Sequence, residues 1–172
     1  MEMECAEMTG RSLTRDGQRE EVRRLRGAMV QPAWGQFLGR VPWEQFETLT
    51  FDPARRHGLG RRLAAAEALR WCAFLAWISR RPVGWMHAAE VGAGGMWHVH
   101  VPVVGLPRDC WPVAKTVWEK RNGRADVRSV DSPHVATLYT TKQAAETGTV
   151  VFADVLDRYG TAGSVGPTGA RQ

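Results

Sequence analysis

The architecture of the chain follows most directly from one segment, Val83-Gly-Trp-Met-His-Ala-Ala-Glu-Val-Gly-Ala-Gly-Gly-Met-Trp-His-Val-His-Val-Pro-Val-Val104. Residues 83–90 and 96–104 are short runs rich in apolar and β-branched side chains, which is typical of strands. The glycine-rich residues 91–95 between them are typical of a hairpin turn. We therefore expect two antiparallel strands joined by a short loop.

Outside this segment, strand-like and helix-like patterns alternate. Residues 46–51, 125–130 and 149–153 are predicted strands. Residues 60–80, 108–121 and 132–147 are predicted helices, the last of which opens with Ser132 as N-cap and Pro133 at the first helical position. The resulting order, β-α-β-β-α-β-α-β, predicts an α+β domain whose sheet is antiparallel or mixed. Helices would cover one face of this sheet and leave the other partly open for a site.

Length and composition point to one globular domain. The chain has 172 residues, of which 44% are hydrophobic and 24% charged, as in ordinary globular proteins. We expect residues 1–33 to form a flexible or helical extension, residues 34–158 to form the folded domain, and the glycine-rich residues 159–172 to be a disordered tail.

Several classes of protein are disfavoured. No apolar run is long enough to span a bilayer, so no membrane partner is expected, and the acidic N-terminus does not resemble a secretory signal. The three cysteines, Cys5, Cys72 and Cys110, are far apart, which favours the reducing cytoplasm over a disulfide scaffold. The net charge of +5 favours a polyanionic partner, although an arginine-rich composition alone would also produce it.

Two histidines provide the first candidate site. In Trp97-His98-Val99-His100-Val101, alternate side chains of a strand share a face, so both imidazoles would project together while the apolar residues pack on the core. Paired imidazoles can bind a divalent metal through their neutral ring nitrogens. The alternative is a pair of exposed histidines without a chemical role.

The hairpin register selects the third metal ligand. With an odd loop such as residues 93–95, Glu90 lies opposite His98 and on its face, whereas with a two-residue loop His87 faces His100 instead. The odd loop is physically preferable because it avoids burying a lone carboxylate. Two imidazoles and a carboxylate suit Mn²⁺ or Mg²⁺ at a phosphodiester, and other divalent ions also accept this donor set.

A second candidate lies on the helix that begins at Ser132. Tyr139 and Lys142 are three residues apart and Gln143 is four residues from Tyr139, so all three share a helical face. A phenol attacks a phosphate more readily when a metal polarises the phosphate and an ammonium stabilises its charge. The alternative is an amphipathic helix whose tyrosine is half-buried, with Val135 and Leu138 as its packing residues.

Residues 48–51, Thr-Leu-Thr-Phe, form a third element. Leu49 and Phe51 would point to the core, and Thr48 and Thr50 to the open face.

Taken together, these motifs resemble the HUH endonuclease superfamily, in particular rolling-circle replication initiators with a single catalytic tyrosine. The matching elements are Thr48–Phe51, the sequence His98-Val99-His100 and the Tyr-x-x-Lys of Tyr139–Lys142, with Glu90 as the upstream acidic ligand. The stretch 118–127 before the tyrosine helix is also similar. The resemblance covers residues 44–147.

The resemblance implies a ferredoxin-like or RRM-like sheet and a nickase that acts on single-stranded or hairpin DNA at a replication origin. It implies a metal bound by His98, His100 and Glu90, attack by Tyr139 to give a 5′-phosphotyrosine, and phosphate stabilisation by Lys142. Thr48, Thr50 and Gln143 would then contact DNA. The sequence has no phosphate-binding loop of the helicase type, so a host helicase is an expected partner.

Three other interpretations remain open at this point. The chain could be a single-tyrosine transposase of the same superfamily, a non-catalytic RRM-like module that binds nucleic acid, or a metal-dependent hydrolase that uses His98 and His100 without Tyr139.

Overall fold

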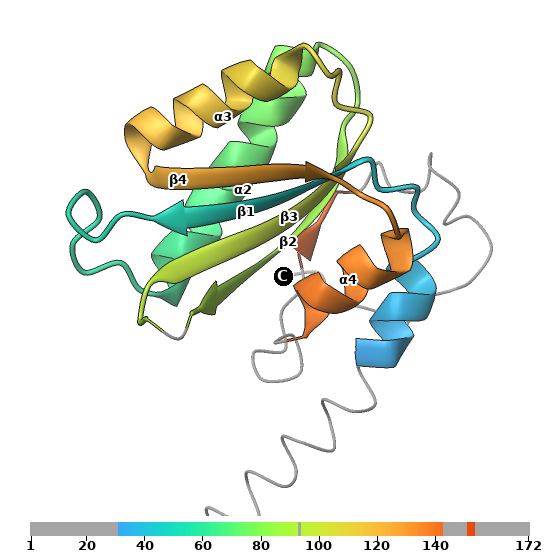
Figure 1. Ribbon diagram of the computed structural model, residues 1–172, viewed down its shortest axis with the longest axis horizontal. Coiled ribbons are helices and arrows are strands. Elements are labelled where there is room, and N and C mark those ends of the chain that lie inside the picture. Colours follow the sequence, from blue (N-terminus) through green and yellow to red (C-terminus); the bar gives the residue numbers. More distant parts are fainter. Residues whose placement is uncertain (1–30, 93, 143–150, 154–172) are drawn as a thin grey trace, which may run out of the picture.

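The structure, a computed structural model, describes residues 31–92, 94–142 and 151–153. Its elements are β1 (Gln45–Phe51), α2 (Arg61–Ser79), β2 (Gly84–Val91), β3 (Trp97–Val104), α3 (Cys110–Arg121), β4 (Gly123–Ser129), α4 (Pro133–Thr141) and β5 (Val151–Phe152). Residues 31–38, which span the predicted boundary between the extension and the folded domain, are also helical. This order is the predicted one (Figure 1). The predicted disordered tail lies outside the described residues.

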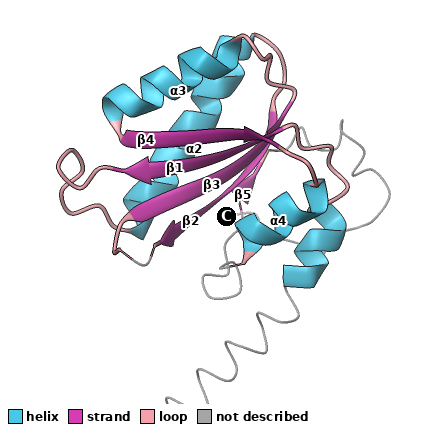
Figure 2. Ribbon diagram, in the orientation of Figure 1, coloured by secondary structure: helices cyan, strands magenta, loops and turns pink. Residues whose placement is uncertain are grey.

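The strands form a single five-stranded sheet in the order β4-β1-β3-β2-β5. Every pairing is antiparallel, which confirms the predicted α+β class and fits a ferredoxin-like type of fold. Figure 2 shows α2 and α3 on one side of the sheet and α4 on the other. Within the described part of the chain, no helix combines the length and the apolar character needed to cross a bilayer.

The main core lies between the sheet and the helices α2 and α3. Its strand residues are the inward-facing ones of β1, β3 and β4, including Leu49, Val101 and Ala125. Tryptophans Trp71 and Trp118, one from each helix, meet edge to face with ring centres 5.3 Å apart. Full burial of large apolar side chains of this kind contributes about 1.5–3 kcal/mol each. This layer holds the sheet rigid beneath the opposite face.

The turn between β2 and β3 has the predicted odd length. Gly92 N–H donates to Met96 O, and Gly95 N–H donates to Gly92 O, so Gly92 and Met96 close the turn with an odd number of residues between them in the sequence. Gly95 has a φ of 73°, the left-handed conformation that such loops require and that glycine adopts without strain. As a result Glu90 is the pairing partner of His98, which confirms the predicted register.

α4 packs differently from the sequence prediction. It is described to Thr141, with Lys142 as its C-cap; the rest of the predicted helix, residues 143–147 with Gln143, lies outside the described residues. The predicted packing residue Val135 is 60% exposed. The helix instead buries small side chains, namely Ala136, Thr137, Thr140 and Thr141.

The three buried threonines need no polar partner outside the helix, because each hydroxyl donates to a carbonyl one turn earlier in α4. The indole N–H of Trp43 adds a cross-link by donating to Thr137 Oγ1 at 3.0 Å. Leu138 lies so close to the helix at residues 31–38 that a Cβ at Gly35 would come within 2.6 Å of it. The contacts with Trp43 and Gly35 hold α4 against the helix at residues 31–38 and the segment before β1.

One carboxylate, that of Glu47, lies in the main core. Glu47 is fully buried, because it shares the inward face of β1 with Leu49 and Phe51. The indole N–H of Trp71 donates to Glu47 Oε2 at 2.6 Å, and the amide of Gln45 donates to Oε1. Burial raises the pKa of Glu47 from 4.5 to about 7, against the opposing effect of the Trp71 hydrogen bond.

This pKa shift predicts that stability falls as pH rises. Between pH 4.5 and about 7 the folded protein keeps the Glu47 proton while the unfolded chain loses it, so the free energy of unfolding should fall by at most about 3 kcal/mol and level off above that range. Glu47→Gln should abolish this component and be more stable than wild type above pH 7. Urea denaturation across this pH range measures it.

Glu119→Gln is the matched control, since this side chain on α3 is 42% exposed. It should keep the wild-type pH profile. Identical pH profiles for Glu47→Gln and wild type would contradict the prediction.

Candidate active site

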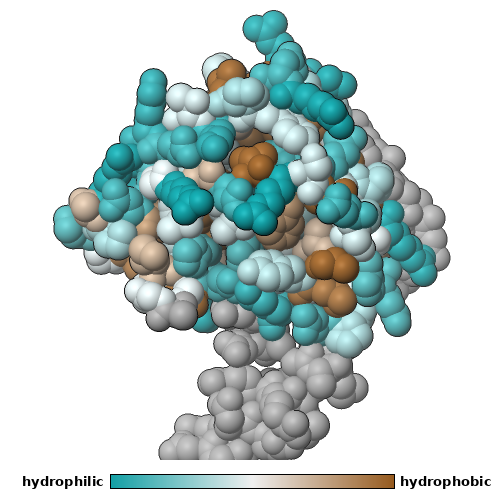
Figure 3. Space-filling view, in the orientation of Figure 1, coloured by the Kyte–Doolittle hydropathy of each residue, from teal (hydrophilic) through white to brown (hydrophobic). Residues whose placement is uncertain are grey.

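The face of the sheet turned toward α4 carries polar side chains in cross-strand rows. Pairing across β4, β1, β3 and β2 aligns Arg124, Thr50, His98 and Glu90 in one row and Asp126, Thr48, His100 and Ala88 in the next. Figure 3 shows this side of the molecule as a mixed surface with hydrophobic atoms in small, separate groups. Both predicted histidines and the predicted carboxylate therefore share one face.

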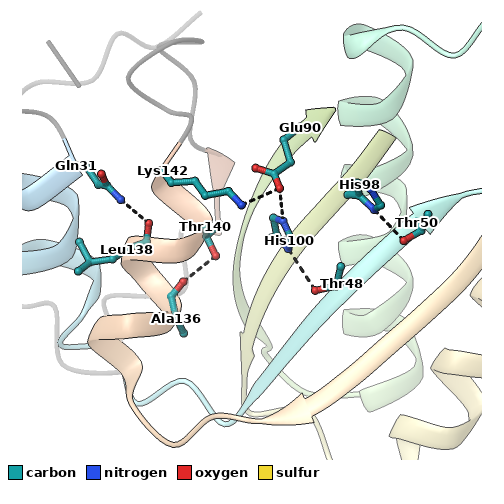
Figure 4. A network of polar contacts seen from close by, with 10 residues as sticks. All are labelled: Gln31, Thr48, Thr50, Glu90, His98, His100, Ala136, Leu138, Thr140 and Lys142. Carbon is teal, nitrogen blue, oxygen red and sulfur yellow. Dashed lines mark hydrogen bonds and ion pairs between the residues drawn. The ribbon is translucent and has the colours of Figure 1, made fainter. Parts of the chain in front are cut away.

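Each imidazole is held by a threonine of β1. Thr48 Oγ1 lies 3.3 Å from His100 Nδ1, and Thr50 Oγ1 lies 2.9 Å from His98 Nδ1 (Figure 4). At His98, an Nδ1–H that donates to the Thr50 hydroxyl leaves the lone pair of Nε2 available to bind a metal. At His100, Nε2 lies 2.7 Å from Glu90 Oε1 and donates to that carboxylate, so Nδ1 accepts from the Thr48 hydroxyl. The resemblance assigns both threonines to DNA contact, which stays a prediction; in the structure their hydroxyls lie beside the imidazoles.

Glu90 lies between two positively polarised groups. Its Oε1 is 2.7 Å from His100 Nε2 and 3.0 Å from Lys142 Nζ, as Figure 4 shows. Burial acts to raise the pKa of Glu90, but the hydrogen bonds and charges of His100 and Lys142 outweigh burial and lower it below its usual value. The carboxylate is therefore ionised and directed into the site.

The two partners of Glu90 respond in opposite directions. Burial lowers the pKa of His100, and the charges of Lys142 and His98 act in the same sense against the attraction of Glu90. Partial burial also acts to lower the pKa of Lys142, but the hydrogen bond and charge of Glu90 raise it overall. The site thus combines a neutral imidazole with a permanent ammonium ion.

Tyr139 reaches over this group from α4. Its ring centre is 4.9 Å from that of His100 and 4.0 Å from Lys142 Nζ. The ring also meets Phe46 of β1 edge to face, at 5.7 Å. Because Tyr139 is 48% exposed, its phenol is accessible to a ligand while its ring is held beside His100.

Two neighbouring residues, Phe46 and Gly92, accommodate the imidazole rings of His100 and His98. Phe46 stacks on the His100 ring with centres 5.6 Å apart, a contact that strand alternation with Thr48 could have predicted. A Cβ at Gly92 would lie 2.4 Å from His98 Nε2, so glycine leaves the space that the imidazole occupies.

The alternative third ligand, His87, is on the wrong face. It is buried and stacks on Trp85, with ring centres 5.8 Å apart, and within the described residues neither ring nitrogen has a hydrogen-bond partner. Burial lowers the pKa of His87 to about 4. The register therefore leaves Glu90 as the ligand that can join His98 and His100.

The two imidazoles and the carboxylate are groups that bind divalent cations, although their donor atoms do not converge on one position. Among the described residues, no three His, Cys, Asp or Glu side chains form a ready metal cluster. Glu90 instead contacts His100 and the ammonium of Lys142. The Lys142 ammonium neutralises the Glu90 carboxylate, and the imidazoles of His98 and His100, each beside a threonine hydroxyl, lie next to it. A divalent cation would meet a carboxylate and two imidazoles here.

Comparison of the chain with protein-family profiles, with curated proteins and with solved structures finds no match. Interpretation of the site therefore depends on the side chains themselves: a half-exposed phenol, two oriented imidazoles, an ionised carboxylate and an ammonium. This combination suits transfer of a phosphoryl group to the phenol.

The threonine contacts predict a role in metal binding. Replacing Thr48 and Thr50 together by valine keeps their shape but removes the groups that orient the imidazoles. Loss of such outer contacts typically weakens metal binding about 10–100-fold. Electron paramagnetic resonance of free Mn²⁺, measured during titration with protein, gives the affinity.

Two variants serve as controls. The double Thr→Ser variant retains both hydroxyls and should bind Mn²⁺ nearly as wild type does. Thr116→Val, on an exposed part of α3, should have no effect. Undiminished Mn²⁺ affinity in the valine double variant would show that the threonines do not orient the ligands.

Proposed function

We propose that the chain is a metal-dependent nickase and strand transferase for single-stranded DNA, of the kind that initiates rolling-circle replication. The observation that supports this most directly is the position of Tyr139: its half-exposed ring lies 4.9 Å from the ring of His100 and 4.0 Å from Lys142 Nζ. A nucleophile, a metal-binding side chain and a phosphate-binding cation are thus adjacent.

His98, His100 and Glu90 would hold the divalent cation, with Mn²⁺ or Mg²⁺ as the proposed ions. When bound, the cation would polarise the scissile phosphate and make its phosphorus more electrophilic. Thr50 would keep Nε2 of His98 available through its contact of 2.9 Å at Nδ1. At His100, a cation would take the place of the Nε2 proton that now faces Glu90, and Thr48, 3.3 Å from Nδ1, would accept the proton that Nδ1 then carries. Glu90 contributes the charge, since its pKa is held below the usual value by His100 and Lys142 despite its burial.

In the proposed reaction the phenolic oxygen of Tyr139 attacks the phosphorus. A Tyr139 O–P bond forms and the bond from phosphorus to the 3′ oxygen breaks. The phenol loses one proton and the departing 3′ oxygen gains one, so the step consumes no water and changes no oxidation state. The phosphotyrosine product keeps the bond energy, and the reverse reaction rejoins a strand.

Lys142 would bind a phosphate oxygen during this transfer. Its ammonium is already beside Tyr139, and Glu90 raises its pKa overall against the effect of burial. A permanent cation close to the transferred group stabilises the charge that develops on the phosphoryl oxygens.

The proposed partner is single-stranded or hairpin DNA at a replication origin. Arg124 is exposed on β4, and the sequence carries a net charge of +5, both of which favour phosphate contacts. Duplex unwinding would fall to a host helicase. A single-tyrosine transposase would use the same chemistry at the same residues.

A non-catalytic nucleic-acid-binding module is the second candidate. The presence of Phe46 and Tyr139 together on the site face favours it, because aromatic rings on an open sheet can stack with bases. The histidines and Glu90 on the same face have no role in that alternative.

If Tyr139 is the nucleophile, a covalent protein–DNA adduct should form only when its hydroxyl is present. Incubation of wild type with a pool of single-stranded oligonucleotides and Mn²⁺ should give a protein–DNA adduct on a denaturing gel. Tyr139→Phe should give none while still binding DNA, because its ring remains but its nucleophile is gone. Tyr159, the other tyrosine of the sequence, supplies the control: Tyr159→Phe should form the adduct normally. Wild-type adduct yield in Tyr139→Phe would refute the proposed nucleophile, and cleavage without any adduct would indicate a hydrolase.

The proposed metal ligands predict a loss of metal-stimulated DNA cleavage when either histidine is replaced. His98→Ala and His100→Ala should each reduce Mn²⁺-stimulated cleavage about 100-fold or more, since a metal contributes several kcal/mol of transition-state stabilisation. The control is His57→Ala, which changes an exposed histidine in the loop after β1. Equal cleavage rates in all three variants and wild type would exclude a catalytic metal at these residues.

A further inference from the structure

An open cavity of about 560 Å³ lies beside Tyr139, between α4 and the strands β1 and β4. Its size is within the ~300–1,000 Å³ typical of small-ligand sites. The lining side chains that could contact a ligand through a ring, an apolar group or a charge are Phe46, Asp126, Arg128, Asp131, Val135 and Tyr139. Because Tyr139 is both the proposed nucleophile and part of the lining, any group in this cavity would adjoin the reacting phosphate.

The walls of the cavity suit the flat faces of an aromatic ligand. Phe46 and Tyr139 contribute rings that meet at 5.7 Å, and Val135 is 60% exposed at the first turn of α4. Stacking on protein aromatic rings is the common way to hold an unpaired base. An exposed apolar side chain at this position also has no part in the packing of α4.

The charges of the cavity disfavour a second phosphate. Asp126 and Asp131 bring two carboxylates and Arg128 one guanidinium, so these three side chains together carry a net negative charge. Arg128, through its hydrogen bond above all, lowers the pKa of Asp126, which keeps that carboxylate ionised. A neutral group with hydrogen-bond donors is a better ligand here than a phosphate.

Asp126 and Arg128 are already aligned for such a group. They alternate on β4 and so share the site face, opposite Thr48 and Phe46 of β1. Arg128 Nε and Nη2 both donate to Asp126 Oδ2, at 3.0 and 2.6 Å. This geometry uses one carboxylate oxygen and one edge of the guanidinium, and leaves Oδ1 and Nη1 for a ligand.

We propose that this cavity takes one guanine base of the DNA strand whose phosphate lies at Tyr139, and that Asp126 and Arg128 determine the specificity for it; the proposal rests on the proposed nickase function. Guanine presents adjacent N1–H and N2–H donors, which the free Oδ1 of Asp126 can accept through its two lone pairs, and an O6 acceptor beside N1, to which Nη1 of Arg128 can donate. Adenine, cytosine and thymine do not offer this pair of adjacent donors. Phe46, Val135 and Tyr139 hold the faces of the base.

The experiment selects sequences from a random pool of single-stranded oligonucleotides. All proteins carry Tyr139→Phe, so that capture reports binding without covalent attachment and the ring remains in the cavity. Sequencing of the bound fraction should give a motif with one position at which guanine is preferred about tenfold or more, the discrimination expected of paired polar contacts.

Three variants and one control then test the cavity. Asp126→Asn and Arg128→Gln should each reduce the guanine preference at that single position about tenfold and leave the other positions unchanged. Val135→Trp should have the same effect by filling the space, without removing a charge. Asp109→Asn, exposed before α3, should keep the complete motif. Circular dichroism establishes that each variant is folded.

The outcomes separate the two proposals. A motif without a guanine position, or one whose guanine position survives in all three cavity variants, would overturn the cavity proposal and leave the nickase proposal standing. Failure of the Tyr139→Phe protein to capture any oligonucleotide would remove the nickase proposal and the cavity proposal with it.

Discussion

A slip of one residue in the pairing of β3 would move His98 and His100 to the core side of the sheet, because strand side chains alternate between faces. The two strands that pair with β3 and the helices packed on its core face prevent this slip. β3 lies between β1 and β2, and Val99, Val101 and Val103 are fully buried against α2 and α3. The hydrophobic layer on one face therefore fixes the position of every polar group on the other, including the threonines of β1 that meet the imidazoles.

Two buried glutamates of the same sheet show how surroundings determine charge. Glu47 faces the core and meets only neutral donors, so burial raises its pKa to about 7. Glu90 faces the site, where His100 and Lys142 outweigh its burial and lower the pKa. Removal of either partner of Glu90 would leave a partly buried negative charge with less compensation, which is costly. The ionised carboxylate and its two neighbours are therefore one electrostatic unit.

Local pattern was sufficient to predict the element order, the hairpin loop and the shared face of Glu90, His98 and His100. Each of these follows from alternation along a strand or from the conformational freedom of glycine. The contacts between Thr48 and His100 could not be predicted in the same way, since they depend on the pairing of strands about 50 residues apart.

The remaining differences also arise from tertiary packing. Val135 is apolar and has helical spacing, yet α4 buries its threonines because their hydroxyls bond within the helix. The position of Glu47 did follow from alternation with Leu49, but its burial depends on the indole of Trp71 reaching it from α2. The cavity beside Tyr139 requires β4 to pair with β1, which sequence pattern does not specify.

The end of α4 has an electrostatic consequence for any anion that approaches Tyr139. This tyrosine lies in the last turn of the helix, where the peptide dipoles add to roughly half a negative charge. A phosphate there would be repelled by the helix that carries Tyr139. Lys142 is the C-cap, and the amide of Gln31 donates to the carbonyl of Leu138 at 2.8 Å. The cation and this donor together offset a repulsion that the fold itself creates.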